Sequence, residues 1–293
     1  MRASTTPDEM KNADTYAGRR LPLSLSLLYS RRSSAIGTSI VLLFLLLALI
    51  GPLLVPYQVN EQLADSAGLP PSTSHWFGTD NLGRDVFSRV VLGARDILLL
   101  AGVGTLLAVL LGTSLGLLSG YRGGWLDEIL MRLFDSLLAI PALLFALLLL
   151  GVVGPSRTSI LIVIIIVYVP IVTRVVRSVA LTEKHKGYIT AARLGGERTT
   201  RILFREILPA TFPALSVESS LRFSYAIFLV ASLGFLGVGV QPPNPDWGLM
   251  VNEARTYASL TPWALIFPAA AIVILVVGVN LMADGLRRLL HEK

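Results

Sequence analysis

Long apolar runs separated by shorter polar segments make up most of the chain. A run of about 20 apolar residues crosses the hydrocarbon layer of a bilayer as a helix, because lipid offers its backbone no other hydrogen-bond partners. The pattern therefore predicts an all-α membrane protein with about six transmembrane helices. They are expected near Ile36 to Val55, Ile97 to Ser119, Leu133 to Val153, Ile160 to Val179, Ala214 to Val238 and Trp263 to Met282. Pro141 and Pro170 interrupt two of these runs and predict kinks.

The polar segment from Leu181 to Pro209 is longer than a connection between two spans needs. It is basic, it contains helix formers and small residues, and it ends at a proline. We expect a short helix along the membrane surface, on which Ala191, Ala192 and Gly196 leave room for the backbone of a partner protein. Arginines at three- and four-residue spacing would stripe that helical surface, namely Arg193, Arg198, Arg201 and Arg205. The competing interpretation is an ordinary solvated loop between two spans.

Composition supports a membrane protein and excludes several kinds of chemistry. Hydrophobic residues make up 53% of the chain and charged residues 15%, with a mean hydropathy of +0.68. Soluble domains average roughly one quarter charged residues. The sequence has no cysteine, which excludes disulfides, cysteine zinc sites and thiol nucleophiles. It also contains no phosphate-binding loop, zinc-protease helix or serine-hydrolase elbow, so we expect no catalytic residue, and uphill transport would need partner ATPases or an ion gradient.

The distribution of basic residues predicts the orientation, because positively charged loops stay on the cytoplasmic side. With the N-terminus inside, about 19 of the 25 lysines and arginines lie on that side. Both termini and the segment from Leu181 to Pro209 are then cytoplasmic. The predicted organisation is a cytoplasmic tail over residues 1–34, a first span and extracytoplasmic loop over 35–95, and a core of five spans over 96–293. Within the tail, Leu21 to Tyr29 is either an interfacial helix or disordered.

Ionisable residues inside the predicted spans are candidates for function, since each costs several kcal/mol when it faces lipid. Glu218 and Arg222 have the i, i+4 spacing of a helical salt bridge, and Tyr225 continues the same face. These three, with Asp135 of the third span, are the candidate residues of a translocation path. A local ion pair with no further role is an equal alternative for Glu218 and Arg222. For Asp135 the alternative is a pair with Arg132, three residues earlier.

His75, Asp80 and Asp85 precede a run of apolar residues at helical spacing that begins at Val86. The Asx residues and glycines in this segment predict turns and a helix N-cap. One imidazole and two carboxylates at intervals of five residues do not meet on one helix face. No metal site is therefore expected here.

Several short motifs resemble one family of transport proteins. Ala191-Ala192, Gly196 and Leu208-Pro209 are similar to the EAA loop in permease subunits of ABC importers. From about residue 30 onward, nearly the whole chain resembles the C-type permease subunits of dipeptide, oligopeptide and nickel importers. The residues that carry this likeness are Gly78-Thr79-Asp80, Gly83-Arg84-Asp85, Gly93-Ala94-Arg95, Gly120-Tyr121, Met131-Arg132, Asp135, Pro141, Phe235-Leu236-Gly237, Gln241-Pro242-Pro243, Trp247-Gly248 and Asp284-Gly285-Leu286-Arg287.

The resemblance implies the type I ABC importer permease fold, in which the loop forms a coupling helix held in a cleft of an ATP-hydrolysing subunit. The residues that it would place against that subunit are Ala191, Ala192, Arg193, Gly196, Leu208 and Pro209. Three positions depart from the family pattern: Thr190 stands where Glu is usual, Glu206 where Ile is usual, and Val230 where the fifth span usually carries an acid. For Val230 we expect either that the polar character of the span lies elsewhere or that the pore passes a different solute.

The resemblance also implies partners and a location. The partners would be a homologous B-type permease subunit, two ATP-binding subunits, an extracytoplasmic solute-binding protein and the lipid of a bacterial inner membrane, with no nucleic acid. ATP and magnesium would be bound by the partner subunits, and this chain would hold no cofactor and no metal. Dipeptides or oligopeptides would be the cargo, with nickel or another metal chelate, glutathione and opines as alternatives. An ion-gradient-driven secondary transporter is the second hypothesis and a membrane-embedded hydrolase the third, although interior carboxylates are sparse and no nucleophile and base are recognisable.

Overall fold

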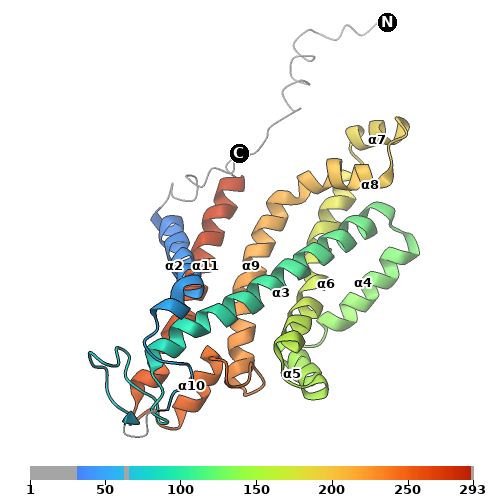
Figure 1. Cartoon of the computed structure of the whole chain (residues 1–293). Coiled ribbons are helices and arrows are strands. Elements are labelled where there is room, and N and C mark those ends of the chain that lie inside the picture. Colours follow the sequence, from blue (N-terminus) through green and yellow to red (C-terminus); the bar gives the residue numbers. More distant parts are fainter. Residues whose placement is uncertain (1–31, 63–65, 292–293) are drawn as a thin grey trace, which may run out of the picture.

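The computed structural model describes residues 32–62 and 66–291, and this part of the chain is largely helical (Figure 1). The predicted tail, including Leu21 to Tyr29, lies outside the described residues up to position 31. The elements are α2 (Arg32–Leu54), α3 (Val86–Arg122), α4 (Gly124–Leu138), α5 (Ala142–Val153), α6 (Arg157–Glu183), α7 (Gly187–Leu194), α8 (Thr199–Arg201), the π-helix η3 (Ile202–Ile207), α9 (Leu208–Phe235), α10 (Trp247–Arg255) and α11 (Pro262–His291).

Within the described residues, five stretches are long and apolar enough to cross a membrane: α2, α3, α6, the segment from Thr199 to Phe235, and α11. The pair α4 and α5 meets the same criterion jointly, but the two helices are bent by 90° relative to each other. The number of spans agrees with the prediction when this pair counts as one. The kink predicted at Pro141 is present and is a complete break: Pro141 has no N–H to continue the ladder of α4 and instead precedes the first residue of α5.

The helices run between two ends of the molecule (Figure 1). One end carries α7 and α8, and the start of α2 and the last turns of α11 point toward it. The other end carries α10 and the loop that joins α2 to α3. We refer to these as the α7 end and the α10 end. The described chain begins and finishes toward the α7 end, as an even number of crossings requires.

A row of glycines on α3 lets α6 approach its backbone closely. Gly112, Gly116 and Gly120 repeat every four residues, so they lie on one face of α3. A Cβ on Gly116 would lie 2.7 Å from the carbonyl oxygen of Thr173 and 2.8 Å from the Cβ of Val176, both in α6. No side chain fits in that space. Small residues at such positions allow membrane helices to associate through close van der Waals contact, since lipid tails remove the hydrophobic effect between them.

Two groups of buried apolar side chains hold the helices together. The larger joins α2, α3, α4, α5, α6, α9, α10 and α11 and includes the fully buried Trp247. The smaller group lies at the α7 end and is called the α7 cluster here. It consists of Leu117, Val172, Val176, Ala180, Ile189, Ile202, Leu203, Ile207 and Leu215. Because Ile189 belongs to α7 and Leu215 to α9, the surface helix is attached to the spans by apolar contact as well as by the chain.

We predict that Gly116→Ala destabilises the protein whereas Gly102→Ala in the same helix does not. The methyl group at position 116 would force α3 and α6 apart, at the cost of about 1–3 kcal/mol that is typical of overpacking. A Cβ at position 102 would meet one neighbour at an ordinary 3.8 Å, and alanine favours the helix by about 1 kcal/mol over glycine. Thermal unfolding of the purified variants in detergent measures both, and equal midpoints would contradict this account of the α3–α6 contact.

Candidate functional site

The inner side of α7 is held against the spans. Ile189 is fully buried in the α7 cluster. The Nε of Arg193 donates to the Tyr121 hydroxyl at 3.0 Å, and the guanidinium lies 4.6 Å from the centre of that ring. The Tyr188 hydroxyl donates to Glu183 at 2.5 Å. Since Tyr121 lies in the last turn of α3 and Glu183 ends α6, these contacts attach α7 to two spans.

The outer side of α7 is open. Thr190, Ala191 and Leu194 are exposed, and Leu194 has 86% of its surface accessible. The short side chain of Ala191 leaves the helix backbone accessible, while Leu194 projects an apolar side chain beside it. Ala192 is half-buried. An apolar side chain at the edge of a bare helix surface is suited to contact with another protein. The sequence motif predicted Ala191 and Ala192 for this contact but missed Leu194.

Gly196 lies beyond the end of α7. Its N–H donates to the carbonyl of Arg193 at 3.0 Å, and the N–H of Glu197 donates to the carbonyl of Ala192 at 3.1 Å, the paired bonds of a Schellman motif. Its φ of 74° is a conformation that glycine adopts at little cost. The prediction that Gly196 and the arginines at 193, 198, 201 and 205 share one helical surface is therefore wrong, because the helix that carries Arg193 ends at Leu194.

The remaining two predicted coupling residues begin α9. Leu208 is half-buried against the α7 cluster. Pro209 is exposed in the first turn of α9. Both follow η3, a π-helical turn of the kind that often occurs at functional sites. These two residues therefore link α7 to α9 and are separate from the open face at Ala191.

The segment from Thr199 to Phe235, which contains α9, has the lowest mean hydropathy of the five candidate spans. The ion pair expected in this span is present: Arg222 Nε lies 2.7 Å from Glu218 Oε1, with 14% and 13% of the two side chains exposed. The N–H is not directed at the carboxylate, so neither atom gains a hydrogen bond. The guanidinium also lies over the rings of Tyr168 and Tyr225, 5.6 Å and 4.8 Å from their centres.

A cavity of about 290 Å³ opens beside Arg222, between α5, α6 and α9. Its lining is mainly apolar and includes Tyr168, Tyr225 and Phe228. The first residues of α5 form one wall, and no side chain caps the N–H groups at the start of that helix. Arg222 and Tyr225 thus share a cavity, as the candidate path requires, while Glu218 stands one helical turn away as the counter-ion.

Asp135 does not belong to this cavity. It lies on α4 and pairs with Arg174 of α6. The alternative predicted pair with Arg132 is wrong, because Arg132 pairs with Glu128 at 2.5 Å. Asp135 thus connects α4 to α6, and the structure does not bring it together with the other three candidate residues.

Val230 is almost fully buried in the larger core. An acid at this position would lie among apolar side chains, so valine suits the packing. The polar groups of α9 lie two to three turns earlier, at Glu218 and Arg222. Both explanations for this departure, a shift of the polar character along the span and a different solute, stay predictions.

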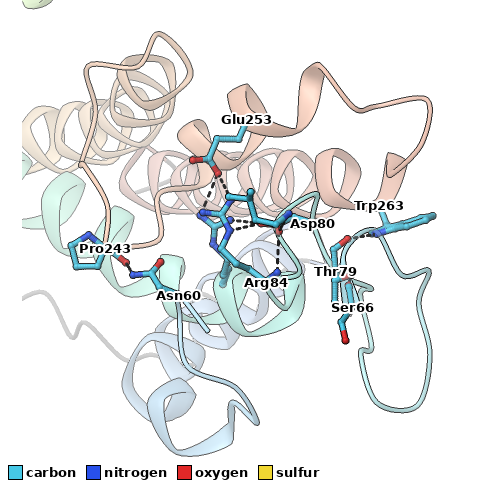
Figure 2. A network of polar contacts seen from close by, with 10 residues as sticks. Asn60, Ser66, Thr79, Asp80, Arg84, Pro243, Glu253 and Trp263 are labelled. Atoms are coloured by element: carbon cyan, nitrogen blue, oxygen red, sulfur yellow. Dashed lines mark hydrogen bonds and ion pairs between the residues drawn. The ribbon is translucent and has the colours of Figure 1, made fainter. Parts of the chain in front are cut away.

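A buried group of charges joins the loop before α3 to α10 (Figure 2). Asp80 accepts from Arg84 at 2.6 Å and from Arg89 at 2.9 Å, and Glu253 of α10 accepts from Arg84 at 2.6 Å. The side chains of Asp80, Arg84 and Arg89 are each 8% exposed or less. We call these four residues the ionic cluster. A charge this deeply buried is tolerated because its partners satisfy it.

The other residues of this loop have structural partners too. His75 Nδ1 lies 2.9 Å from Asp85, which also accepts from the Ser88 N–H as the N-cap of α3, as predicted. The three candidate side chains for a metal site are thus divided between the ionic cluster and a helix cap. Within the described residues, no group of three His, Asp or Glu side chains is placed to hold a metal ion.

Further hydrogen bonds join the loops at the α10 end into one surface. Trp263 Nε1 donates to the carbonyl of Thr79 at 2.8 Å, and Asn60 donates to the carbonyl of Pro243 at 3.0 Å (Figure 2). The described parts of this loop, residues 56–62 and 66–85, are therefore attached to the segment 241–263.

Asp246, the N-cap of α10, is a buried carboxylate. Its Oδ1 accepts from the Leu249 N–H at 2.8 Å, and the side chain lies against Gly234 at the end of α9. Burial raises the pKa of Asp246 to about 6, with a smaller contribution from the charge of Asp96 and against the opposing effect of backbone N–H groups.

Comparison with known proteins gives the family. Residues 112–293, more than half of the chain, match the family model described as "Binding-protein-dependent transport system inner membrane component". The chain belongs to this family. It is therefore a transport permease, and its apolar helices are those of a multi-pass inner-membrane protein.

Relatives over most of the chain agree with this result. The permease is 40% identical over 266 residues to the dipeptide transport system permease protein DppC of Alkalihalophilus pseudofirmus, covering 91% of this chain and 88% of that one. It is 41% identical over 255 residues to the glutathione transport system permease protein GsiD of Pectobacterium atrosepticum (86% and 84% covered). It is 37% identical over 264 residues to the oligopeptide transport system permease protein OppC of Bacillus subtilis (90% and 87% covered). The resemblance to C-type permease subunits is confirmed, and with it the importer permease fold.

We predict that Asp80→Ala strongly destabilises the permease. The change leaves Arg84 and Arg89 sharing Glu253 alone, and breaking a buried ion pair costs about 3–5 kcal/mol. The control Glu128→Ala removes a carboxylate from an exposed pair, in which 77% of the Arg132 side chain and 62% of Glu128 are accessible, and it should cost about 0.5 kcal/mol. Thermal unfolding in detergent measures both. A loss at Asp80 no larger than at Glu128 would show that the ionic cluster does not stabilise the fold.

The buried Asp246 predicts a pH dependence of stability. Its pKa of about 6 in the folded protein lies above the ordinary value of 3.8, so the folded state binds this proton more tightly than the unfolded state. The stability that the proton confers is complete below about pH 4 and is lost as the pH rises through about 6. Between those limits wild type should lose up to about 3 kcal/mol more than the Asp246→Asn variant. Unfolding midpoints across this pH range measure the difference, and parallel curves would contradict it.

Proposed function

We propose that the permease forms half of the membrane pathway of an ATP-driven importer of short peptides. The observation that carries this proposal is α7, which is held to α3 and α6 by Arg193, Tyr188 and Ile189 and is open at Ala191 and Leu194. A helix tied to two spans and bare on its other side is suited to pass movement of a soluble subunit into the membrane. In the proposal an ATP-binding subunit covers the open face.

The proposed orientation places the α7 end in the cytoplasm. Most basic residues then lie inside, in accordance with the positive-inside rule, and both ends of the chain are cytoplasmic. The α10 end faces outward, where residues 56–62, 66–85 and 241–263 form a connected surface. That surface would receive the solute-binding protein.

The proposed assembly contains a homologous B-type permease, two ATP-binding subunits and an extracytoplasmic solute-binding protein. Large exposed side chains along α9, among them Tyr225 and Phe228, support a second permease subunit against this face. A further apolar cavity of about 420 Å³ continues the same surface between α5, α9, α10 and α11. ATP and magnesium would be bound by the ATP-binding subunits, so this chain would hold no cofactor and catalyse no reaction.

Short peptides are the proposed cargo. By name, the three relatives above carry dipeptides, oligopeptides and glutathione, which is itself a small peptide. None of these three is named for a metal chelate or an opine. An ion-driven mechanism has less support, because Glu218, the carboxylate in the middle of α9, is already neutralised by Arg222 and offers no free charge to a coupling cation.

The proposed translocation path follows α9. Arg222 and Tyr225 line a cavity on the least apolar span, and Glu218 supports the guanidinium from outside that cavity. Asp135 pairs with Arg174 and has no place in the proposed path.

Single cysteines provide the test, since the chain has none of its own. In the reconstituted importer, Leu194→Cys and Ala191→Cys should be joined to an ATP-binding subunit by a short bismaleimide, and the yield should change when ATP is added. Leu260→Cys, exposed at the α10 end, is the matched control and should be joined to the solute-binding protein instead.

Cross-linking of Leu260→Cys to an ATP-binding subunit would invert the proposed orientation. If neither cysteine on α7 reached that subunit while the complex still hydrolysed ATP, another segment would have to transmit the movement, and the proposed role of α7 would be wrong.

A further inference from the structure

The cavity beside Arg222 contains a charged group with unused hydrogen-bonding capacity. A guanidinium has five N–H donors, and buried donors in proteins are normally bonded. In the described part of the chain, the guanidinium of Arg222 lies near one carboxylate and two tyrosine rings, and its buried Nε has no hydrogen-bond partner. In the ionic cluster of the same chain, by contrast, Arg84 is hydrogen-bonded to both Asp80 and Glu253.

We propose that Arg222 binds the free carboxylate of the peptide cargo as it passes through this cavity. The inference rests on the proposed function and adds to it the group of the cargo that is recognised. Arginine binds carboxylates through two parallel N–H···O bonds, which are about twice as strong as bonds between neutral groups.

The surroundings of Arg222 suit a carboxylate with an apolar remainder. Tyr168 and Tyr225 lie beside the guanidinium and hold it by cation–π contact without using its N–H groups. The cavity walls are otherwise mostly apolar. The uncapped start of α5 adds the positive end of a helix dipole, an arrangement that broken membrane helices use toward anionic solutes. An inorganic anion has no apolar part to place against these walls.

Glu218 keeps Arg222 neutralised while the cavity is empty. Its carboxylate approaches the guanidinium from one helical turn away and does not line the cavity. A cargo carboxylate therefore reaches Arg222 from the other side and shares it, so the buried cation is never left unpaired.

The carboxylate is the group that peptides of different sequence have in common. Dipeptides and longer peptides differ in side chains and length, but every unmodified one ends in a carboxylate. A single path that serves all of them has to contact what they share, and the apolar walls leave the variable side chains unselected.

Charge replacement at a single position tests the inference. The double variant Glu218→Gln/Arg222→Cys removes both charges, so no carboxylate is left unpaired. In proteoliposomes with the complete importer, its ATP-dependent uptake of radiolabelled dialanine should fall about tenfold or more. An aminoethyl methanethiosulfonate reagent, which adds an ammonium at position 222, should restore most of the uptake. The sulfonatoethyl and methyl reagents should restore none.

The matched control is Glu128→Gln/Arg132→Cys, which removes the same two charges from an exposed pair on α4. It should import at the wild-type rate with every reagent. The unsubstituted importer, treated in parallel, accounts for cysteines in the partner subunits. Arg222→Lys keeps the charge without modification and should retain uptake within about tenfold of wild type.

If the restored uptake depended on the size of the added group and not on its charge, the carboxylate site would be overturned. Full uptake by the unmodified double variant would overturn it as well. If the double variant does not assemble, an Arg222→Lys importer that hydrolyses ATP but does not take up dialanine would overturn it equally. In each case ATP-dependent uptake by the wild-type importer would leave the proposed function intact. Wild-type complexes without such uptake would overturn the proposed function and the site together.

Discussion

The close approach of α3 and α6 is the contact on which the rest of the molecule depends. α3 has 37 residues and is about 55 Å long, more than the thickness of a bilayer core. Its first turn carries Arg89 into the ionic cluster, and its last turn carries Tyr121 to α7. The glycines that face α6 allow the two backbones to come into close contact, and this contact sets the position of one helix against the other. Both ends of the permease are thus attached to a single helix in a defined position.

Buried charges are treated differently in two parts of the chain. In the ionic cluster, hydrogen bonds join Arg84 and Arg89 to carboxylates and fix the loops at the α10 end, and only the Nε of Arg89 among the cluster's buried nitrogens has no partner. In α9, Arg222 and Glu218 neutralise each other without a directed hydrogen bond. A satisfied network rigidifies a structure, whereas donors left open retain the capacity to bind a ligand. The difference separates residues that maintain the framework from those that are available to a solute.

The membrane fold could be predicted from hydropathy because an apolar segment in lipid has to form a helix to satisfy its backbone hydrogen bonds. The contacts between helices could not be predicted in this way. The spacing of Asp135 and Arg132 suggested a pair, but the partner of Asp135 is Arg174 on another helix. The prediction that the arginines share one helical surface is wrong because the helix ends before Gly195 and Gly196. Glycines are a helix-end signal, and this one was present in the sequence. Leu194 was missed because its exposure depends on which side of α7 faces the bundle, and the burial of Ile189 decides that.

The break between α4 and α5 shows how a chain can bend without losing backbone hydrogen bonds. Pro141 has no N–H to offer the carbonyl of Leu137, and that carbonyl accepts from the Ile140 N–H at 3.3 Å instead. The Pro141 carbonyl accepts in turn from the Phe145 N–H at 3.0 Å, in the first turn of α5. The chain thus bends by 90° while both carbonyls stay bonded. Because lipid offers no replacement for a missing backbone bond, an apolar segment can bend this sharply only where such bonds are kept.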